Sequence, residues 1–348
     1  MSLNRELSTA KDETLWSTPP LRAVQAPRSF PRAITRREWL IHSGLFLLTF
    51  CTSTLAGITL AAPELPIAEP PFASPIDFVL YLPLAYVFLG KALVAYALTY
   101  PAIILQGLAF SLSLLTILFS HEMGHYLACR YYGVDATLPY FLPAPPLFLA
   151  GTFGAFIKIR SPIPTRRALF DIGLAGPLAG FVVALPIAVV GLLVMQPPQP
   201  VTGSGIIFND PLLFRLLAPV LGVQLDPYSP INPYYMAAWI GLLVTSLNLM
   251  PVGQLDGGHG TFALFGPRAH SIIGRTAFMT VAILAGMGFW LYGSPSGFLF
   301  ALLLGIMMRV KHPQPAVMEP LGWKRILIAI LTLVVFALCF WPFPVALT

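Results

Sequence analysis

The stretch that decides the fold is residues 103–129, IILQGLAFSLSLLTILFSHEMGHYLAC. Residues 103–120 carry no charged side chain, and a helix needs about 20 mainly apolar residues to cross the hydrocarbon of a bilayer. Such a run must be helical, because lipid offers the backbone no hydrogen-bond partners. The run ends on His121, Glu122 and His125, which are costly beside lipid unless they have a function. We therefore expect a membrane-spanning helix with chemistry at its end.

The composition of the whole chain agrees with a membrane location. Of 348 residues, 57% are hydrophobic and 10% are charged, and the mean hydropathy is +0.78. Soluble proteins average about 25% charged residues, so this chain is too apolar for a single water-soluble core. The net charge of +6 comes from basic residues between apolar runs. It therefore indicates membrane topology and not nucleic-acid binding.

Further apolar runs predict an all-α polytopic membrane protein with about seven transmembrane helices. The expected spans are residues 39–62, 103–129, 172–195, 234–250, 272–292, 295–309 and 325–346. Residues 78–99 form a further apolar run, which Lys91 interrupts. We expect residues 1–38, which are polar, to form a flexible cytosolic tail, and residues 39–348 to form one membrane-embedded domain.

The basic residues also indicate how the chain is oriented. If the N-terminus is cytosolic and residues 78–99 do not cross, all of the 20 Lys and Arg residues except Lys91 and Arg215 lie on the cytosolic side. A full crossing by residues 78–99 would move every later loop to the other side and largely remove this bias. The positive-inside rule therefore favours seven spans, an external C-terminus, and residues 78–99 in the interface or re-entering the membrane.

Residues 135–165 differ from the apolar runs. They are rich in proline, contain glycine, and alternate between residue types from Thr152 to Ile159. Non-helical backbone is tolerated at membrane depth only where protein buries it or where it lines a cavity. We expect a short, membrane-dipping loop that resembles a β-hairpin.

The sequence His121-Glu122-Met123-Gly124-His125 is the strongest chemical signal. Helical residues four apart lie on one face, so the two histidines can hold one zinc ion. Glu122, one position along, can act as a general base toward a water molecule. The alternative is a pair of interfacial histidines with ordinary hydrogen-bond partners.

A catalytic zinc site usually has a third protein ligand, and Asp256 is the best candidate. It lies in residues 248–259, NLMPVGQLDGGH, where an apolar helix gives way to a glycine-flanked turn. An aspartate that merely caps a helix is the alternative. Cys129, four residues after His125, is the competing ligand. It lies about 12 Å along the helix from His121, at about 1.5 Å per residue, which is too far for a shared ion.

These motifs together resemble the site-2 protease family of intramembrane metalloproteases. The family pairs HExxH, here residues 121–125, with a distant NxxPxxxLDG, here residues 248–257. The resemblance extends to residues 151–154, GTFG, and residues 176–180, GPLAG, and covers roughly residues 100–260. The sequences GTFGAF and LPYFLPAPP are most similar to the subgroup of chloroplast ethylene-dependent gravitropism-deficient proteins and their bacterial relatives.

The resemblance implies a zinc metalloendopeptidase with one Zn²⁺ per chain. It implies that the metal ligands are His121, His125 and Asp256, that Glu122 is the catalytic base, and that residues 100–260 form the catalytic core. His259 would lie next to the metal ligands, and the alternative is a surface or helix-capping role.

The resemblance also implies how substrate is held. Asn248 and Pro251 would place substrate or support the site. Residues 151–159 would pair with an unwound substrate segment as an added strand, with Gly151 and Gly154 permitting close backbone approach. The alternative for this stretch is an ordinary hairpin. The small residues of the 173–180 segment are explained by close helix packing, without a catalytic role.

The expected function is hydrolysis of peptide bonds in or near transmembrane segments of membrane proteins. The expected partners are a membrane-protein substrate and the lipid bilayer, in a bacterial cytoplasmic membrane in preference to a chloroplast membrane. One alternative is a zinc-binding membrane chaperone or scaffold without proteolysis, although binding alone would not need Glu122. Another is a prenyl-protein type protease, which would take Glu319 as its third ligand.

Overall fold

The computed structural model describes residues 34–62, 75–145, 148–198, 206–310, 312 and 314–347. Residues 1–33 of the expected tail lie outside these ranges. The helices are α1 (Arg36–Ala61), α2 (Pro75–Thr99), α3 (Ala102–Tyr131), α4 (Arg166–Leu193), α5 (Leu212–Leu221), α6 (Pro233–Asn248), α7 (Asp256–Tyr292), α8 (Ser296–Met307) and α9 (Trp323–Cys339). The strands are β1 (Tyr140–Pro143), β2 (Thr152–Phe156), β3 (Ile206–Phe208) and β4 (Val345–Leu347).

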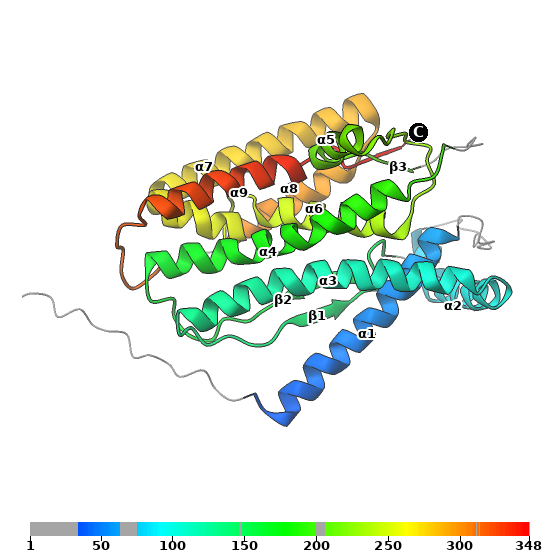
Figure 1. Cartoon of the computed structure of the whole chain (residues 1–348), viewed down its shortest axis with the longest axis horizontal. Helices are drawn as coiled ribbons and strands as arrows, with labels where there is room; N and C mark the ends of the chain where they lie inside the picture. The colour runs from blue at the N-terminus through cyan, green and yellow to red at the C-terminus, as the bar shows by residue number, and fades with distance from the viewer. Residues whose placement is uncertain are drawn as a thin grey trace, which may run out of the picture.

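Helix α4 lies at the centre of the molecule and contacts α3, α6 and α7 (Figure 1). The core between these helices is filled by large side chains with almost no exposed surface. Examples are Phe110, Leu114, Phe170, Met236 and Leu242. Because protein interiors are close-packed, α3, α4, α6 and α7 hold one another in fixed positions.

Helix α1 crosses α3 obliquely at a contact between two glycines (Figure 1). A Cβ atom at Gly57 would lie 2.8 Å from the Cβ of Phe110, and one at Gly107 would lie 2.7 Å from the carbonyl oxygen of Thr54. Small residues let membrane helices approach closely, so these two positions fix where α1 and α3 meet.

The protein is mostly helical, and four of its helices are long and apolar enough to cross a membrane. These four, found among the described residues, are α1, α3, α4 and α7. The expected spans 234–250, 295–309 and 325–346 correspond to α6, α8 and α9, which have 16, 12 and 17 residues and are shorter than the usual span. Helix α7 extends the expected span 272–292 back to Asp256, across a kink at Gly266.

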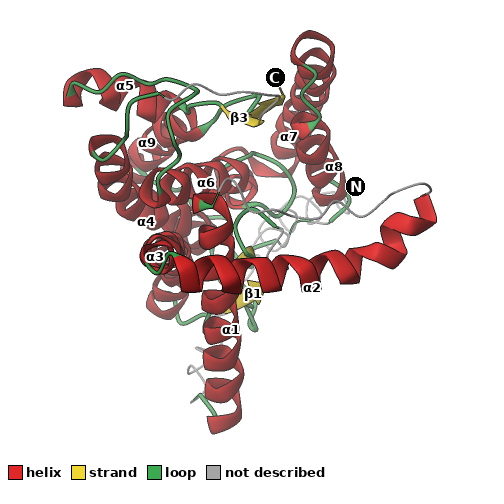
Figure 2. Cartoon of the chain, turned by 90° about the vertical axis from the view of Figure 1, so that its right-hand side faces the viewer, coloured by secondary structure: helices red, strands yellow, loops and turns green. Residues whose placement is uncertain are grey.

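Helix α2, the ambiguous apolar run, does not lie alongside the long helices. In Figure 2 α3 is seen almost end-on, whereas α2 extends across the view and away from the other helices. Its described contacts are with α1 and α3, and they include the buried residues Leu89 and Leu93.

Residues 135–165 contain an antiparallel pair of strands, β1 and β2, in which Phe141 lies opposite Ala155. This pair packs on α1 and contacts α3 through β2. In the described part of the chain, β1 is the strand paired with β2, so the other edge of β2 has no strand beside it.

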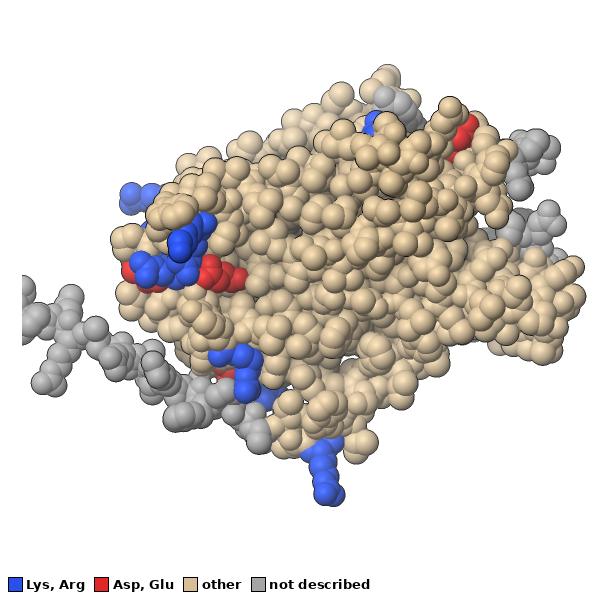
Figure 3. All heavy atoms as spheres, in the orientation of Figure 1, with Lys and Arg blue, Asp and Glu red and all other residues tan. Residues whose placement is uncertain are grey.

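Most Lys and Arg side chains on the face shown in Figure 3 lie toward the end of the molecule where α3 finishes and α4 begins. The basic residues near the opposite end include Arg215, whose guanidinium lies over the Trp341 ring at 3.9 Å. The charge distribution therefore distinguishes the two ends of the helices.

Candidate metal centre

His121, Glu122 and His125 lie toward the C-terminal end of α3. They are 4%, 6% and 7% exposed, respectively. The two histidines are one helical turn apart and face the same side, with ring centroids 4.9 Å apart. Burial of three such polar side chains is unfavourable unless they have partners, and Asp256 supplies one.

Asp256, the first residue of α7, completes a triangle of ligand atoms. Its Oδ2 lies 3.3 Å from Nε2 of His121 and 3.3 Å from Nε2 of His125. The two Nε2 atoms are 3.2 Å apart. A tetrahedral zinc ion with bonds of about 2.0–2.1 Å separates its ligand atoms by about 3.3–3.4 Å. The triangle therefore has the size that zinc requires, and among the described residues it is the group that could hold a metal ion.

Two glycines bring the start of α7 against the preceding turn. A Cβ atom at Gly257 would collide with the carbonyl group of Leu249, and one at Gly258 would collide with that of Gly253. The structure thus places Asp256 in the first turn of a helix and not in the flexible turn that the sequence suggested. The glycines are required because helix and turn touch backbone to backbone.

Helix α4 supports both histidines from behind. The carbonyl oxygen of Ile172 lies 2.7 Å from Nδ1 of His125. The Nδ1–H can donate to it and leave Nε2 for a metal, as is usual for metal-binding histidines. A Cβ atom at Gly176 would overlap the His125 ring, and one at Gly180 would lie 3.2 Å from Cβ of His121.

A cavity of about 610 Å³ opens beside the triangle. Glu122 lines it together with the three ligand residues, and its carboxylate lies within reach of the backbone N–H of Ile157. The residues that follow β2, from Ile157 to Ile159, form another wall. A peptide in this cavity would lie between Glu122 and the chain that continues β2.

Asn248 and Pro251, expected beside the substrate, occupy different surroundings. Asn248 lines the cavity, and its side-chain Nδ2 lies 3.3 Å from Nε2 of His121. Pro251 lies in the turn between α6 and α7, where its carbonyl oxygen faces Gly274 of α7.

Gly151 and Gly154 also differ. Both have a positive φ angle, 62° at Gly151 and 101° at Gly154. A Cβ atom at Gly151 would collide with the carbonyl group of Thr52 in α1, whereas the space at Gly154 is open. The close backbone approach at Gly151 is therefore to α1.

Sequence reasoning missed the role of the small residues in α4. The expectation was packing between helices alone, but Gly176 and Gly180 each face one histidine of the triangle. Their spacing of four residues equals that of His121 and His125, and this was the available signal. Cys129, the rival ligand, is fully buried in the core and is not part of the triangle.

A comparison with protein families matches residues 109–292 to peptidase family M50. This match covers more than half of the chain. The chain belongs to peptidase family M50. The matched residues include every residue of the triangle, and the likeness to the chloroplast subgroup expected from the sequence is confirmed by relatives that are chloroplast proteins.

Curated relatives of this M50 chain include plant zinc metalloproteases. It is 31% identical to the probable zinc metalloprotease EGY1, chloroplastic, of Arabidopsis thaliana, over 88% of this chain and 54% of that protein. It is 30% identical to the probable zinc metalloprotease EGY2, chloroplastic, of the same plant, over 70% of this chain and 43% of that protein. The chain thus spans about half the length of these relatives. No solved structure matches it.

These relatives correct the expected location. We expected a bacterial cytoplasmic membrane, with a chloroplast membrane as the less favoured choice. The relatives are named as chloroplastic, so the preference for a bacterial membrane is wrong. Proteins of the two membranes have similar composition and charge bias, and the sequence alone therefore could not distinguish the two locations. The family and the names of the relatives do confirm zinc as the expected metal.

Proposed function

We propose that the chain is an intramembrane zinc metalloprotease that hydrolyses peptide bonds in or next to transmembrane segments of membrane proteins. The observation that carries the proposal is the buried triangle of His121, His125 and Asp256, with Glu122 beside it on the wall of a cavity. Three protein ligands leave a tetrahedral metal one open position, as in catalytic zinc sites.

The side chains then divide the work. His121, His125 and Asp256 would hold the zinc, which when bound would supply a Lewis acid. Glu122 accepts a proton from the attacking water and returns it to the leaving amine. Glu122 is buried, and burial strengthens the electrostatic interactions of a carboxylate with reacting groups. A scaffold that only bound zinc would have no use for this carboxylate.

Substrate binding follows from the position of β2. A membrane helix hides its peptide bonds in i to i−4 hydrogen bonds, so a substrate must unwind before it can be cut. We infer that the unwound segment adds to the free edge of β2 and its continuation, which form a wall of the cavity. Gly154 would allow close approach, Asn248 would contact the substrate, and Gly151 and Pro251 would support the surrounding backbone.

The arrangement in the membrane is also a proposal. We infer seven spans, with α6, α8 and α9 crossing as short helices, α2 in the interface, and β1–β2 dipping toward the metal site. The basic end in Figure 3 supports placing this site on the side from which the protein inserts, which is the stroma in a chloroplast. Residues 39–348 would form the membrane-embedded domain, with its catalytic core at about 100–260.

The test is to find proteins that accumulate when cleavage stops. Membranes from cells that carry the wild-type chain or Glu122→Gln are compared by quantitative proteomics. Full-length membrane proteins that accumulate with Glu122→Gln, and whose fragments disappear, support the proposal. Identical membrane proteomes would favour a zinc-binding protein without proteolytic activity.

A further inference from the structure

A second histidine pair adjoins the metal centre. His259 lies in the first turn of α7, three residues after Asp256 and therefore on the same face of the helix. It lines the cavity with Glu122. Gly173 of α4 allows this, because a Cβ atom there would lie 2.7 Å from Cβ of His259. His259 is thus held beside the ligands and in contact with the space for substrate.

The partner of His259 is His312, from the segment between α8 and α9. Nε2 of His312 lies 2.8 Å from Nδ1 of His259. The His312 ring stacks on Phe262, with centroids 4.1 Å apart and planes at 6°. Phe262 lies one helical turn after His259, so α7 orients both rings. With Nδ1 of His259 engaged by His312, Nε2 is the ring nitrogen left for the cavity.

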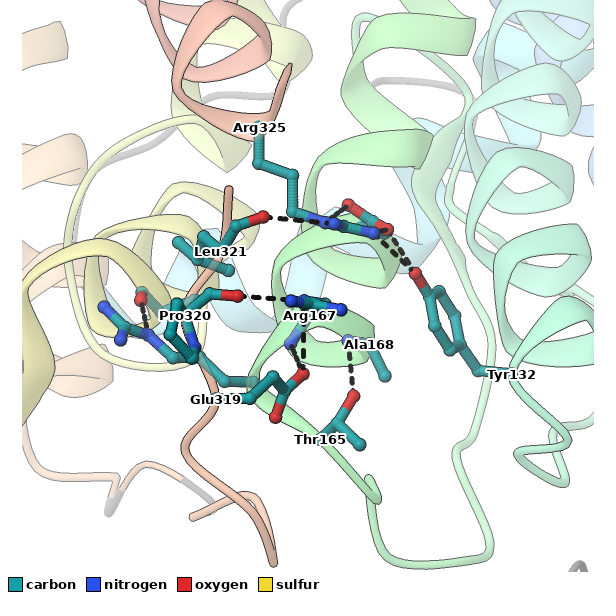
Figure 4. Close-up of polar contacts among 11 residues, drawn as sticks. Tyr132, Thr165, Arg167, Ala168, Glu319, Pro320, Leu321 and Arg325 are labelled. Carbon is teal, nitrogen blue, oxygen red and sulfur yellow. Dashed lines mark hydrogen bonds and ion pairs between the residues drawn. The ribbon is translucent and has the colours of Figure 1, made fainter. Parts of the chain in front are cut away.

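Residues 314–322, which we call the strap, fasten this segment to the start of α4. The backbone N–H of Arg166 donates to Val317 at 2.9 Å, and the backbone N–H of Arg167 donates to the Glu319 carboxylate at 3.0 Å. Arg167 Nε donates to the carbonyl oxygen of Pro320 at 2.9 Å (Figure 4). Glu319, the third ligand in the prenyl-protein protease alternative, therefore holds the strap against the start of α4.

A second anchor lies where the strap meets α9. Arg325 binds both carboxylate oxygens of Asp171, at 2.9 and 2.6 Å, and contacts the hydroxyl of Tyr132 at 3.0 Å (Figure 4). Burial and then the hydrogen bond to Asp171 raise the pKa of Tyr132 to about 12, so its phenol stays protonated and donates to Asp171. The strap is thereby tied to α3 and α4.

We propose that His259 donates a hydrogen bond from Nε2 to a carbonyl oxygen of the substrate peptide, and that His312 positions it for this contact. The inference rests on the proposed proteolytic function. When Nε2–H of His312 donates to Nδ1 of His259, the proton of a neutral His259 resides on Nε2, in a ring that lines the cavity. A preorganised donor of this kind stabilises charge that develops on a carbonyl oxygen.

The position of His312 in the chain adds a consequence. The match to the family ends at residue 292, and His312 lies beyond it. The α8–α9 segment therefore supplies a positioning residue to a site whose other members lie within the family domain. If His259 and His312 served only to pack the helices, aromatic rings without ring nitrogens would suffice at both positions. The hydrogen bond between the two histidines would then have no role.

The first test determines which ring nitrogen of His259 carries the proton. The full chain, labelled with ¹⁵N at histidine and purified in detergent micelles, is studied by NMR. We expect His259 to have an unprotonated Nδ1 and a protonated Nε2. In His312→Phe, which keeps the ring stacked on Phe262, we expect His259 to populate both tautomers. An unchanged His259 spectrum in His312→Phe would overturn the proposal.

The second test is kinetic and uses a dye-labelled single-span reporter peptide with a Pro-Gly pair at the centre of its span. His259→Phe should lower kcat on the order of 10²-fold with little change in KM. His312→Phe should lower kcat about tenfold. The double variant should be no slower than His259→Phe, because His312 acts through His259. Additive losses in the double variant would contradict this.

The matched control is His270→Asn. His270 belongs to the same cluster of rings, with its ring centroid 5.2 Å from that of His312. Its hydrogen-bond partner, however, is Thr261. A kcat of His270→Asn equal to that of the wild-type chain supports the proposal. A loss of kcat equal to that in His312→Phe would show that His259 and His312 act only through packing. Glu122→Gln is assayed in parallel. No cleavage by the wild-type chain would contradict the proposed proteolytic function. An active wild-type chain and an inactive Glu122→Gln, together with fully active Phe variants, would contradict this inference alone.

Discussion

The imidazole ring of His125 lies directly against Gly176, in the space that a side chain at that position would fill. The same ring is bonded through Nδ1 to Ile172, one turn earlier in α4. Helix α4 contributes no metal ligand, yet it fixes the orientation of one. The metal centre is therefore built by three helices, with ligands from α3 and α7 and support from α4.

Replacing Gly176 should cause loss of the metal although no ligand residue is substituted. In Gly176→Ala the new methyl group displaces the His125 ring, so we expect zinc content and activity to fall together. Zinc per mole of purified protein is the measurement. Gly286→Ala is the control, because a Cβ atom at this helical glycine of α7 meets open space. Full zinc in Gly176→Ala would show that α4 does not constrain His125.

The third ligand is tested by comparing Asp256→Ala with Cys129→Ala. Asp256→Ala should lose zinc and activity, because two histidines alone leave the metal with too few protein ligands. Cys129→Ala should keep both, since Cys129 is fully buried in the core and away from the triangle. The measurement is zinc per mole of each purified variant. Full zinc in Asp256→Ala with loss of zinc in Cys129→Ala would make Cys129 the third ligand.

The edge of β2 is tested at Gly154. Gly154→Ala should raise KM for the reporter peptide, because the methyl group would stand where substrate backbone approaches. Gly133→Ala is the control, since Gly133 also has a positive φ and a Cβ atom there would meet open space, but Gly133 lies outside β2. Both substitutions put a side chain at a positive φ angle, so both variants carry backbone strain. An equal KM in both would argue against strand addition at Gly154.

Much of this site could be predicted from the sequence, because its ligands lie in short motifs. The spacing of His121 and His125 on an apolar helix determines their geometry, and Asp256 is marked by the glycines that follow it. The contacts of Gly176 and His312 could not be predicted in the same way. They depend on which face of α4 meets α3 and on where the segment between α8 and α9 meets α7, and no local pattern encodes either.

The fold shows the same division. Long apolar runs predicted α1, α3 and α4 closely, because a continuous run of such residues in lipid must be helical. The start of α7 was not predicted, since Gly266 and Pro267 suggest a break, whereas the structure continues the helix across a kink. Short helices such as α8 stay ambiguous, because 12 residues are fewer than a span usually needs.

The proposed topology predicts which loops share a side of the membrane. Pro162→Cys and Tyr228→Cys place an exposed thiol at opposite ends of the bundle, in a chain whose Cys51 is replaced by Ala. In sealed vesicles of known orientation, a membrane-impermeant maleimide should label Tyr228→Cys from the external face and Pro162→Cys only from the insertion side. External labelling of Pro162→Cys would overturn the arrangement, including the interfacial position of α2.

The most direct test of the central claim measures zinc and cleavage together in Glu122→Gln. Both the wild-type chain and the variant should bind about one zinc ion, because Glu122 is not in the ligand triangle. The wild-type chain should cut the single-span reporter peptide, and a chelator should stop it. Glu122→Gln should be slower by a factor on the order of 10² or more, because it cannot accept the proton. Cleavage by zinc-loaded Glu122→Gln at the wild-type rate would contradict the account.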